Sequence, residues 1–80
     1  MVAETHPGLA DDFKEGIKLA TTNDFIKAAE LFKRLAEKGH AEAQFYLGLM
    51  YEGGRGVSKD DQQAAFWWEK SAEQGNILAQ

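Results

Sequence analysis

A segment of this chain recurs at a fixed offset of 36 residues, and this internal repeat constrains the fold more than any other feature. Residues 24–44 and 60–80 are identical at eight of 21 positions, and Phe32 aligns with Trp68, so an aromatic residue matches an aromatic one. The identical pairs are Asp24 and Asp60, Ala28 and Ala64, Ala29 and Ala65, Ala36 and Ala72, Glu37 and Glu73, Gly39 and Gly75, Ala43 and Ala79, and Gln44 and Gln80. A repeat of this period predicts a solenoid of stacked helix pairs, which is an architecture of scaffolds and binding proteins.

Composition and charge limit the class of protein. The 80 residues make one small unit at most, and 44% hydrophobic with 28% charged residues is typical of a globular chain. The net charge of -4 argues against nucleic acid as a partner, because phosphates need a basic surface. Cysteine is absent, so neither a disulfide nor a thiolate metal site can form.

The sequence shows no sign of membrane insertion or export. No apolar run approaches the length of a membrane span, and residues 1–9 lack the basic start and apolar stretch of a signal peptide. We therefore expect a soluble protein, either cytoplasmic or an exported protein in its mature form without its leader. The sequence leaves both compartments open.

Apolar residues recur at helical spacing in four segments, which predicts an all-α protein. The expected helices cover residues 8–21, 24–38, 41–52 and 59–74. Gly39 and Gly75 each follow a helix and are placed to adopt the left-handed conformation that ends it. Ser58 precedes the fourth helix and is expected to cap its N-terminus. The inner stripe of that helix is expected to contain Ala64, Ala65, Trp68 and Ala72.

The expected third helix is apolar on almost every side, so neighbours must cover it from several directions. Gly48 in its middle disfavours the helix by about 1 kcal/mol relative to alanine. The compensation that we expect is a close helix–helix contact, which a side chain would obstruct. Trp68 is expected to fill the core between helices, whereas Trp67 packs on a following repeat or is partly exposed.

Residues 41–76 resemble a Sel-one-like repeat (SLR), a relative of the tetratricopeptide repeat with a longer loop between its two helices. The resemblance rests on Ala43, Leu47, Gly48, Tyr51, Gly54, Gly56, Val57, Asp60, Ala64, Trp67, Trp68, Ala72 and Gly75. An earlier segment resembles the repeat less fully, because it lacks the glycine loop. The expected organisation is a flexible lead-in at 1–8, a degenerate first repeat at 9–40, a full repeat at 41–76 and the truncated start of a third at 77–80.

The resemblance implies an α-solenoid of two antiparallel helix pairs, a fragment of a tetratricopeptide-like superhelix. Members of such families serve as adaptors or scaffolds for other proteins. The partner implied is therefore a protein or peptide segment, bound on a concave helical surface without any cofactor. A basic or amphipathic partner would suit the negative net charge.

In the tetratricopeptide relatives, the first helix of each pair lines the inner surface. The residues that this chain would place there are Phe13, Ile17, Glu42, Phe45, Leu49 and Glu52. Together they would form a peptide groove with apolar anchors and acidic rims. The alternative interpretation is that Phe45 and Leu49 simply pack on neighbouring helices.

No arrangement of residues points to chemistry. The glycine loop at 53–57 does not follow a strand and lacks the Lys-Ser/Thr order of a phosphate loop, so it indicates a connection between helices. His6 and His40 form no spaced metal motif, and His40 is expected to serve the turn between repeats. We expect neither an enzyme nor a metal site. The remote alternative is a β-lactam-interacting enzyme, as linked to some cysteine-rich relatives of the repeat, whose paired cysteines this chain lacks.

Self-association is the second functional hypothesis. The fourth helix would leave apolar surface uncovered, and the last residues, 77–79, are apolar although end repeats of a solenoid need polar caps. The chain is then a piece of a longer array, or it forms a homo-oligomer through this uncapped C-terminal edge.

Overall fold

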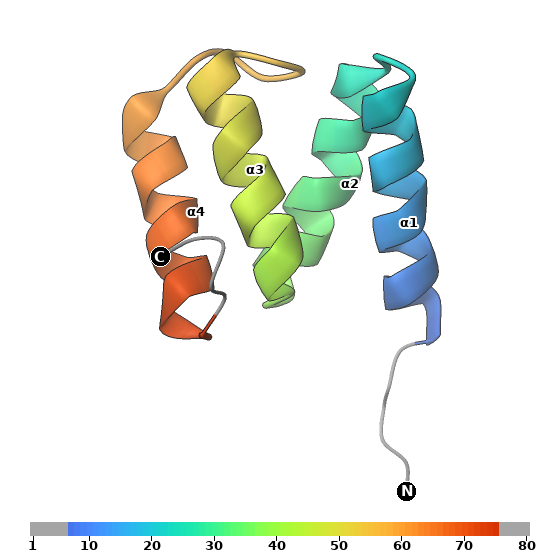
Figure 1. Ribbon diagram of the computed structural model, residues 1–80, viewed down its shortest axis with the longest axis horizontal. Coiled ribbons are helices and arrows are strands. Elements are labelled where there is room, and N and C mark those ends of the chain that lie inside the picture. The colour runs from blue at the N-terminus through green and yellow to red at the C-terminus, as the bar shows by residue number, and fades with distance from the viewer. Residues whose placement is uncertain (1–6, 76–80) are drawn as a thin grey trace, which may run out of the picture.

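The computed structural model of the protein describes residues 7–75, with side chains from residue 11 onward, and within this part it contains helices and no strand (Figure 1). The helices are α1 (Pro7–Thr21), α2 (Phe25–Glu37), α3 (Ala41–Gly53) and α4 (Asp61–Glu73). The prediction of an all-α fold is confirmed, and the helix ends agree with the expected ones to within two residues. None of these helices has the length and apolarity needed to cross a membrane. His6, most of the lead-in at 1–8 and the third-repeat start at 77–80 lie outside the described residues.

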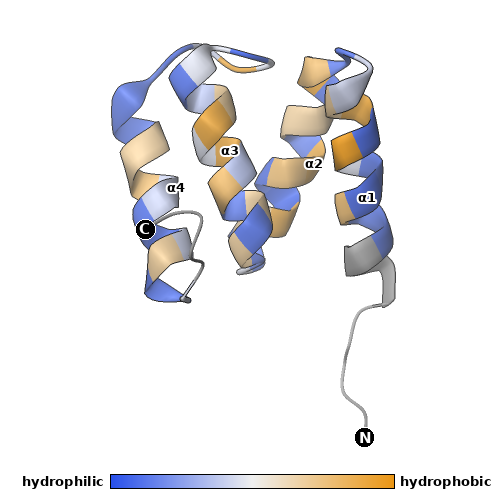
Figure 2. Cartoon of the chain, viewed as in Figure 1, coloured by the Kyte–Doolittle hydropathy of each residue, from blue (hydrophilic) through white to orange (hydrophobic). Residues whose placement is uncertain are grey.

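The helices lie side by side in chain order, and each packs mainly against its neighbours in the chain (Figure 1). Successive helices run in opposite directions, so α1 with α2 and α3 with α4 form two antiparallel pairs. Figure 2 shows hydrophobic residues along much of α3, whereas the start of α4 is hydrophilic. The main cluster of buried hydrophobic residues comes from the two middle helices and comprises Ala28, Ala29, Phe32, Leu35, Ala36, Ala43, Leu47 and Met50.

An aromatic ring seated on a glycine joins the two helices of each pair. A Cβ added to Gly48 of α3 would lie 2.5 Å from Nε1 and 2.6 Å from Cδ1 of Trp68 on α4. A Cβ added to Gly16 of α1 would likewise lie 2.8 Å from Cε1 of Phe32 on α2. The close contact expected at Gly48 is therefore present. The Trp68 indole N–H also donates to the Phe45 carbonyl at 3.2 Å, so a hydrogen bond orients the ring.

Side chains of α3 join the two pairs to each other. Tyr46 stacks on Phe32 with 5.5 Å between the ring centroids. Gln44 is buried, and its Nε2 donates to the Ala36 carbonyl at 3.0 Å while its Oε1 accepts from Nε2 of Gln74 at 2.9 Å. A buried amide without such partners would cost about 1–3 kcal/mol. Gln44 therefore fixes α2, α3 and α4 relative to one another.

The turn between the pairs is closed by His40, which caps the N-terminus of α3. Its Nδ1 accepts from the backbone N–H of Ala43 at 3.1 Å, and its ring stacks on Phe13 of α1 at 4.8 Å. Near this turn, the buried Ser71 hydroxyl of α4 donates to the Ala41 carbonyl at 2.7 Å. Helices α1 and α4 are thus both tied to the start of α3.

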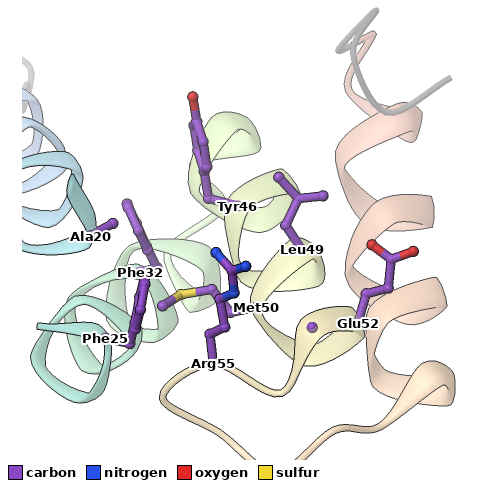
Figure 3. A pocket seen from close by; sticks show the side chains of 9 residues that line it. Ala20, Phe25, Phe32, Tyr46, Leu49, Met50, Glu52 and Arg55 are labelled. Atoms are coloured by element: carbon purple, nitrogen blue, oxygen red, sulfur yellow. The ribbon is translucent and has the colours of Figure 1, made fainter. Parts of the chain in front are cut away.

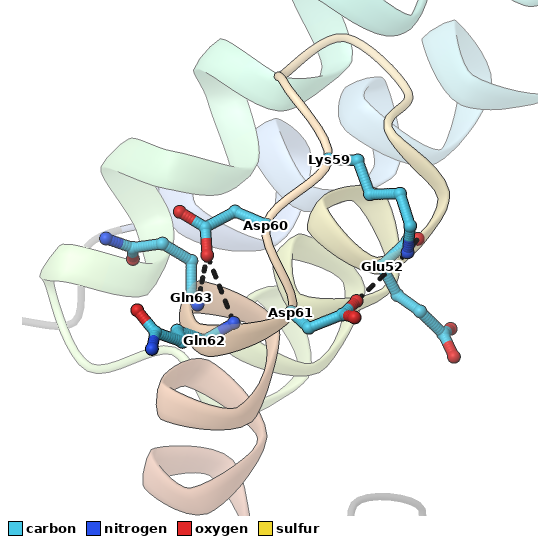
Figure 4. A network of polar contacts seen from close by, with 6 residues as sticks. All are labelled: Glu52, Lys59, Asp60, Asp61, Gln62 and Gln63. Carbon is cyan, nitrogen blue, oxygen red and sulfur yellow. Dashed lines mark hydrogen bonds and ion pairs between the residues drawn. The ribbon is translucent and has the colours of Figure 1, made fainter.

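The start of α4 differs from the expectation. Ser58 is exposed in the loop, and the residue that caps the helix is Asp60. Its carboxylate accepts from the backbone N–H groups of Gln62 and Gln63 at 3.0 and 3.1 Å (Figure 4). The predicted Ser58 cap is wrong because the backbone N–H of Asp60 donates to the Tyr51 carbonyl at 2.9 Å. The chain is therefore held against α3 until Asp60, and the helix begins only after it.

The inner stripe of α4 also differs from the expectation. Ala64 and Ser71 are buried and Trp68 is half-buried, but Ala65 is exposed. Its counterpart Ala29 on α2 is 3% exposed, because α3 and the loop after it cover that face. No described element covers α4 in the same way. An alanine at this position of the repeat is therefore buried only where a further helix pair packs on it.

Replacing Gly48 by alanine is expected to lower the free energy of unfolding by about 1–2 kcal/mol. Overpacking costs about 1–3 kcal/mol, and a contact of 2.5 Å belongs to the upper part of this range, so the cost outweighs the gain of about 1 kcal/mol that alanine brings to a helix interior. The backbone limits relaxation, since the added Cβ would also lie 3.1 Å from the Ala64 carbonyl oxygen. Urea unfolding followed by circular dichroism measures the change.

Gly53→Ala is the matched control for Gly48→Ala. A Cβ at Gly53 would meet nothing closer than Arg55 Cγ at 3.6 Å, which is an ordinary contact distance. We expect its free energy of unfolding to stay within about 0.5 kcal/mol of the wild-type value. Unchanged or increased stability of Gly48→Ala would contradict a tight seat for the tryptophan ring.

Candidate functional site

The two α1 residues expected on the inner surface serve mainly to attach their helix. Phe13 is half-buried, and its ring centroid lies 5.9 Å from that of Phe32 and 5.7 Å from that of Tyr46. Ile17 is half-buried too and packs against the same core. Both side chains are largely occupied by contacts within the molecule.

The α3 residues expected on the inner surface separate into two groups. Glu42 is exposed in the first turn, and Phe45 is half-buried with its ring edge-on to Tyr46 at 5.6 Å. Leu49 and Glu52, which follow along the helix, both line one pocket. The structure thus brings Leu49 and Glu52 together and leaves Glu42 and Phe45 outside this pocket.

This pocket, which we call the Leu49 pocket, has a volume of about 340 Å³ and lies between α1, α2, α3 and the loop after α3 (Figure 3). Its lining consists of Ala20, Phe25, Phe32, Tyr46, Leu49, Met50, Glu52, Gly53 and Arg55. Most of these side chains are apolar, and Leu49 is 38% exposed although it is a large hydrophobic residue. The volume lies at the small end of the range for ligand pockets and suits one or two apolar side chains of a peptide.

Two charged side chains complete the lining, and they point in different directions. Figure 3 shows the Arg55 guanidinium directed toward the α3 side chains of the pocket, whereas the Glu52 carboxylate points away from it. The Arg55 guanidinium carbon lies 5.4 Å from the centroid of the Phe25 ring, within the range of a cation–π interaction. Among the described residues, no carboxylate lies within ion-pair distance of Arg55.

Two glycines fix the position of Arg55. Gly54, with φ 67°, ends α3 in the left-handed conformation, and Gly56, with φ 75°, turns the chain toward α2. A Cβ added to Gly56 would overlap the Phe25 carbonyl oxygen, so the loop lies directly on the start of α2. The Arg55 backbone N–H donates to the Met50 carbonyl at 2.9 Å. The arginine is therefore held between the end of α3 and the start of α2.

Lys59 fastens the far end of the same loop. Its Nζ donates to the Glu52 carbonyl at 2.9 Å and forms an ion pair with Asp61 at 3.0 Å (Figure 4). Such an exposed ion pair contributes at most about 1 kcal/mol. The bond to Glu52 satisfies a carbonyl of the kind that the last turn of a helix leaves without an intrahelical partner. The loop is thus held to α3 at both of its ends.

Arg55 is the charged pocket residue that the sequence did not predict. The glycines at 53–57 indicate a connection between helices, but they do not show on which element that connection packs. A usable signal is the Gly-Arg-Gly order directly after a helix, because two glycines at positive φ hold the residue between them in a defined place. Phe25 and Tyr46 were missed as well, since their helical spacing predicts core packing.

A second pocket of about 440 Å³ lies between α2 and α4. Its lining consists of Ala36, Glu37, Gly39, Gln44, Phe66, Trp67, Lys70, Glu73 and Gln74, of which charged and amide side chains make up the majority. The Phe66 side chain already has two neighbours in this pocket. Its ring centroid lies 4.9 Å from that of Trp67 and 5.5 Å from the Lys70 Nζ. This pocket is the weaker candidate for an apolar ligand.

The Leu49 pocket has the size and the apolar lining to take an apolar side chain, with a charged group beside it. Its lining contains no nucleophile next to a base. The described part of the chain also contains no group of histidine and carboxylate side chains that could hold a metal ion.

Comparison with known proteins identifies the repeat. The family model of the Sel1 repeat matches residues 12–40 and 41–76. The crystal structure of a Sel1 repeat protein from Oxalobacter formigenes is similar to this structure, with a TM-score of 0.66 and 44% sequence identity. The similarity covers 68% of this chain and 22% of that chain.

Curated relatives share the same region. The chain is 37% identical over 68 residues to an exopolysaccharide production negative regulator of Rhizobium leguminosarum bv. viciae, covering 85% of this chain and 26% of the relative. It is 41% identical over 58 residues to the localization factor PodJL of Caulobacter vibrioides, covering 71% of this chain and 6% of the relative. It is 34% identical over 53 residues to the ERAD-associated E3 ubiquitin-protein ligase component HRD3A of Arabidopsis thaliana, covering 66% and 8%. The chain spans about a quarter or less of each relative.

Replacing Gly56 by alanine is expected to lower the free energy of unfolding by about 2–4 kcal/mol and to displace Arg55 from the Phe25 ring. The loss combines the strain of a left-handed residue, about 1–2 kcal/mol, with the overlap between the new Cβ and the Phe25 carbonyl. Urea unfolding measures the stability, and nuclear Overhauser contacts between the two side chains report the displacement.

Gly39→Ala is the matched control for Gly56→Ala. Gly39 has φ 92°, but a Cβ there would meet nothing within 4 Å, so only the backbone strain remains. We expect a loss of about 1–2 kcal/mol and intact contacts between Arg55 and Phe25. Equal effects of the two substitutions would show that the loop is not seated on α2.

Proposed function

Because the chain belongs to the Sel1 repeat family, whose members are in general protein-interaction modules, we propose that it binds a peptide or protein segment at the Leu49 pocket. The relatives named above include a localization factor and a ubiquitin-ligase component. The mechanism is one of shape: the helix pairs hold a preformed surface, and a partner inserts a side chain into it. Little of the surface needs to be ordered on binding, which favours affinity.

The observation that carries this proposal is the exposure of Leu49 beside an apolar pocket. Leu49 is 38% exposed and the pocket has room for further apolar side chains, so a partner that covers both would remove apolar surface from water. Burial of such surface stabilises a complex by about 25 cal/mol per Å². Glu42 and Phe45 precede Leu49 on α3, and we propose that they flank a segment lying along this helix. Phe13 and Ile17 support the surface from behind.

We propose no catalytic role for the chain. Sel1 repeat proteins are in general non-enzymatic scaffolds, and the Leu49 pocket lacks a nucleophile next to a base. The alternative of a β-lactam-interacting enzyme rests on cysteine-rich relatives, and this sequence has no cysteine.

Self-association is the second candidate function, and a comparison of equivalent positions favours it. In the first helix pair, Ala29 and Phe32 are 3% and 1% exposed, and the second pair covers part of each, since Gly56 lies against Ala29 and the Tyr46 ring stacks on Phe32. At the equivalent positions of the second pair, Ala65 is exposed and Trp68 is half-buried. The face formed by α3 and α4 therefore has the shape that receives another helix pair, and a second copy of the chain can supply one.

Leu49→Ala is expected to weaken the binding of peptides selected from a displayed random-peptide library by at least about tenfold. The substitution removes the exposed apolar side chain that a ligand would cover. The dissociation constant is measured by fluorescence anisotropy of a labelled selected peptide.

Ile26→Ala is the matched control for Leu49→Ala. Ile26 is 66% exposed on α2 and does not line the Leu49 pocket, so its loss should leave the dissociation constant unchanged. Selected peptides that bind both variants as tightly as the wild type would rule out the Leu49 pocket as the binding site. Circular dichroism verifies that both variants are folded.

Ala65→Arg is expected to abolish self-association while leaving the monomer folded. The alanine is exposed on α4, so a long side chain is tolerated by the monomer but blocks a helix pair from packing there. Gln63→Arg, an exposed position with the same added charge, is the control. Sedimentation velocity at several concentrations measures association, and a wild-type protein that stays monomeric at high concentration would reject this candidate.

A further inference from the structure

The Leu49 pocket contains a positive charge that is oriented but not neutralised. Arg55 is held by the glycines on either side, by its backbone bond to the Met50 carbonyl and by the Phe25 ring under its guanidinium. Within the described part of the chain, no carboxylate forms an ion pair with it. An arginine fixed in this way at the edge of an apolar pocket has its hydrogen-bond donors available to a ligand.

We propose that Arg55 recognises a carboxylate side chain, so that the segment bound at the Leu49 pocket carries an aspartate or glutamate next to an apolar residue. This inference rests on the proposed function and names the chemistry of the partner at the same site. The apolar side chain fills the pocket beside Leu49, and the carboxylate accepts two hydrogen bonds from the guanidinium.

The geometry of the arginine suits this role. The guanidinium carbon lies over the Phe25 ring, 5.4 Å from its centroid, and a cation–π contact of this kind leaves the N–H groups available to donate hydrogen bonds. A guanidinium fork matches a carboxylate in a bidentate arrangement, which is stronger and more directional than a single hydrogen bond. Because the loop holds the backbone of Arg55 and the Phe25 ring lies under its guanidinium, less conformational freedom is lost when the ligand arrives.

The negative net charge does not oppose an acidic ligand at this position. Charges more than about 8 Å apart are largely screened at physiological ionic strength, so the nearest charge dominates the interaction. That charge is Arg55, whereas the Glu52 carboxylate points away from it (Figure 3). The expectation of a basic partner, drawn from the net charge of -4, is therefore replaced at this pocket by an acidic contact.

A side-chain carboxylate fits better than the terminal carboxylate of a chain. Pockets for chain termini use several free backbone N–H groups arranged around the carboxylate. Here the backbone N–H groups of Gly54 and Arg55 both donate to the Met50 carbonyl. These two N–H groups are therefore not available to a terminal carboxylate.

The test uses the whole chain and a displayed random-peptide library. Peptides selected by the wild type should contain an aspartate or glutamate next to an apolar residue. Arg55→Gln should weaken a selected peptide by about tenfold, and replacing the acidic residue of that peptide by its amide should weaken it similarly. Combining the Arg55 substitution with the amide peptide should weaken binding no more than either change alone, because each removes the same contact. Raising the salt concentration should weaken binding only between the wild-type protein and the acidic peptide.

Arg34→Gln is the control, since it changes the net charge by the same amount at an exposed position of α2 that does not line the Leu49 pocket. Selected peptides that depend on Leu49 but not on Arg55 would overturn this inference and leave the proposed function standing. Loss of binding on amidation of the peptide C-terminus, with no effect of the acidic side chain, would also overturn it. A library without any peptide dependent on Leu49 would reject both proposals.

Discussion

The contact between the Trp68 ring and the bare backbone of Gly48 sets the spacing of the second helix pair, and the rest of the structure follows from it. A Cβ at Gly48 would overlap the indole and crowd the Ala64 carbonyl, so α3 and α4 can approach this closely only at glycine. Gly16 and Phe32 make the same contact in the first pair. A glycine whose cost to helix stability is about 1 kcal/mol is thus offset by the packing of a large aromatic ring.

The pocket is a consequence of how the two pairs stack. Phe32, seated on its glycine, presents its ring to Tyr46 of α3 at 5.5 Å, and this stacking places the C-terminal end of α3 opposite the start of α2. The loop that leaves α3 is then close enough for Gly56 to rest on the Phe25 carbonyl. Arg55 reaches the Leu49 pocket because of this sequence of contacts. The family fold and the candidate site are therefore aspects of one packing arrangement.

Much of the fold could be predicted from local rules, and the site only in part. The glycines at 39 and 75 adopt positive φ as expected, and Gly48 makes the predicted close contact. Ser58 does not cap α4, because the cap is decided by a backbone bond from Asp60 to the Tyr51 carbonyl nine residues earlier. Leu49 and Glu52 line the pocket, whereas Arg55 could not be assigned to it without knowing what lies opposite the loop. These misses share one cause, which is contact between segments distant along the chain.

The sequence by itself determined the helices, the repeat and the need for a close contact at Gly48, because each depends on spacing within a helix or between equivalent positions. That the partner in this contact is an aromatic ring was decided by the tertiary structure. Only the tertiary structure decided which repeated positions are covered and which charge faces the pocket. Ala29 and Ala65 occupy equivalent positions of the repeat, yet Ala29 is 3% exposed and Ala65 is open to solvent. Among the described residues, only α2 is followed by another helix pair. In the same way, Arg55 became a candidate binding residue through its cation–π contact with Phe25 and the pocket that it lines, and neither is visible in its neighbours along the chain.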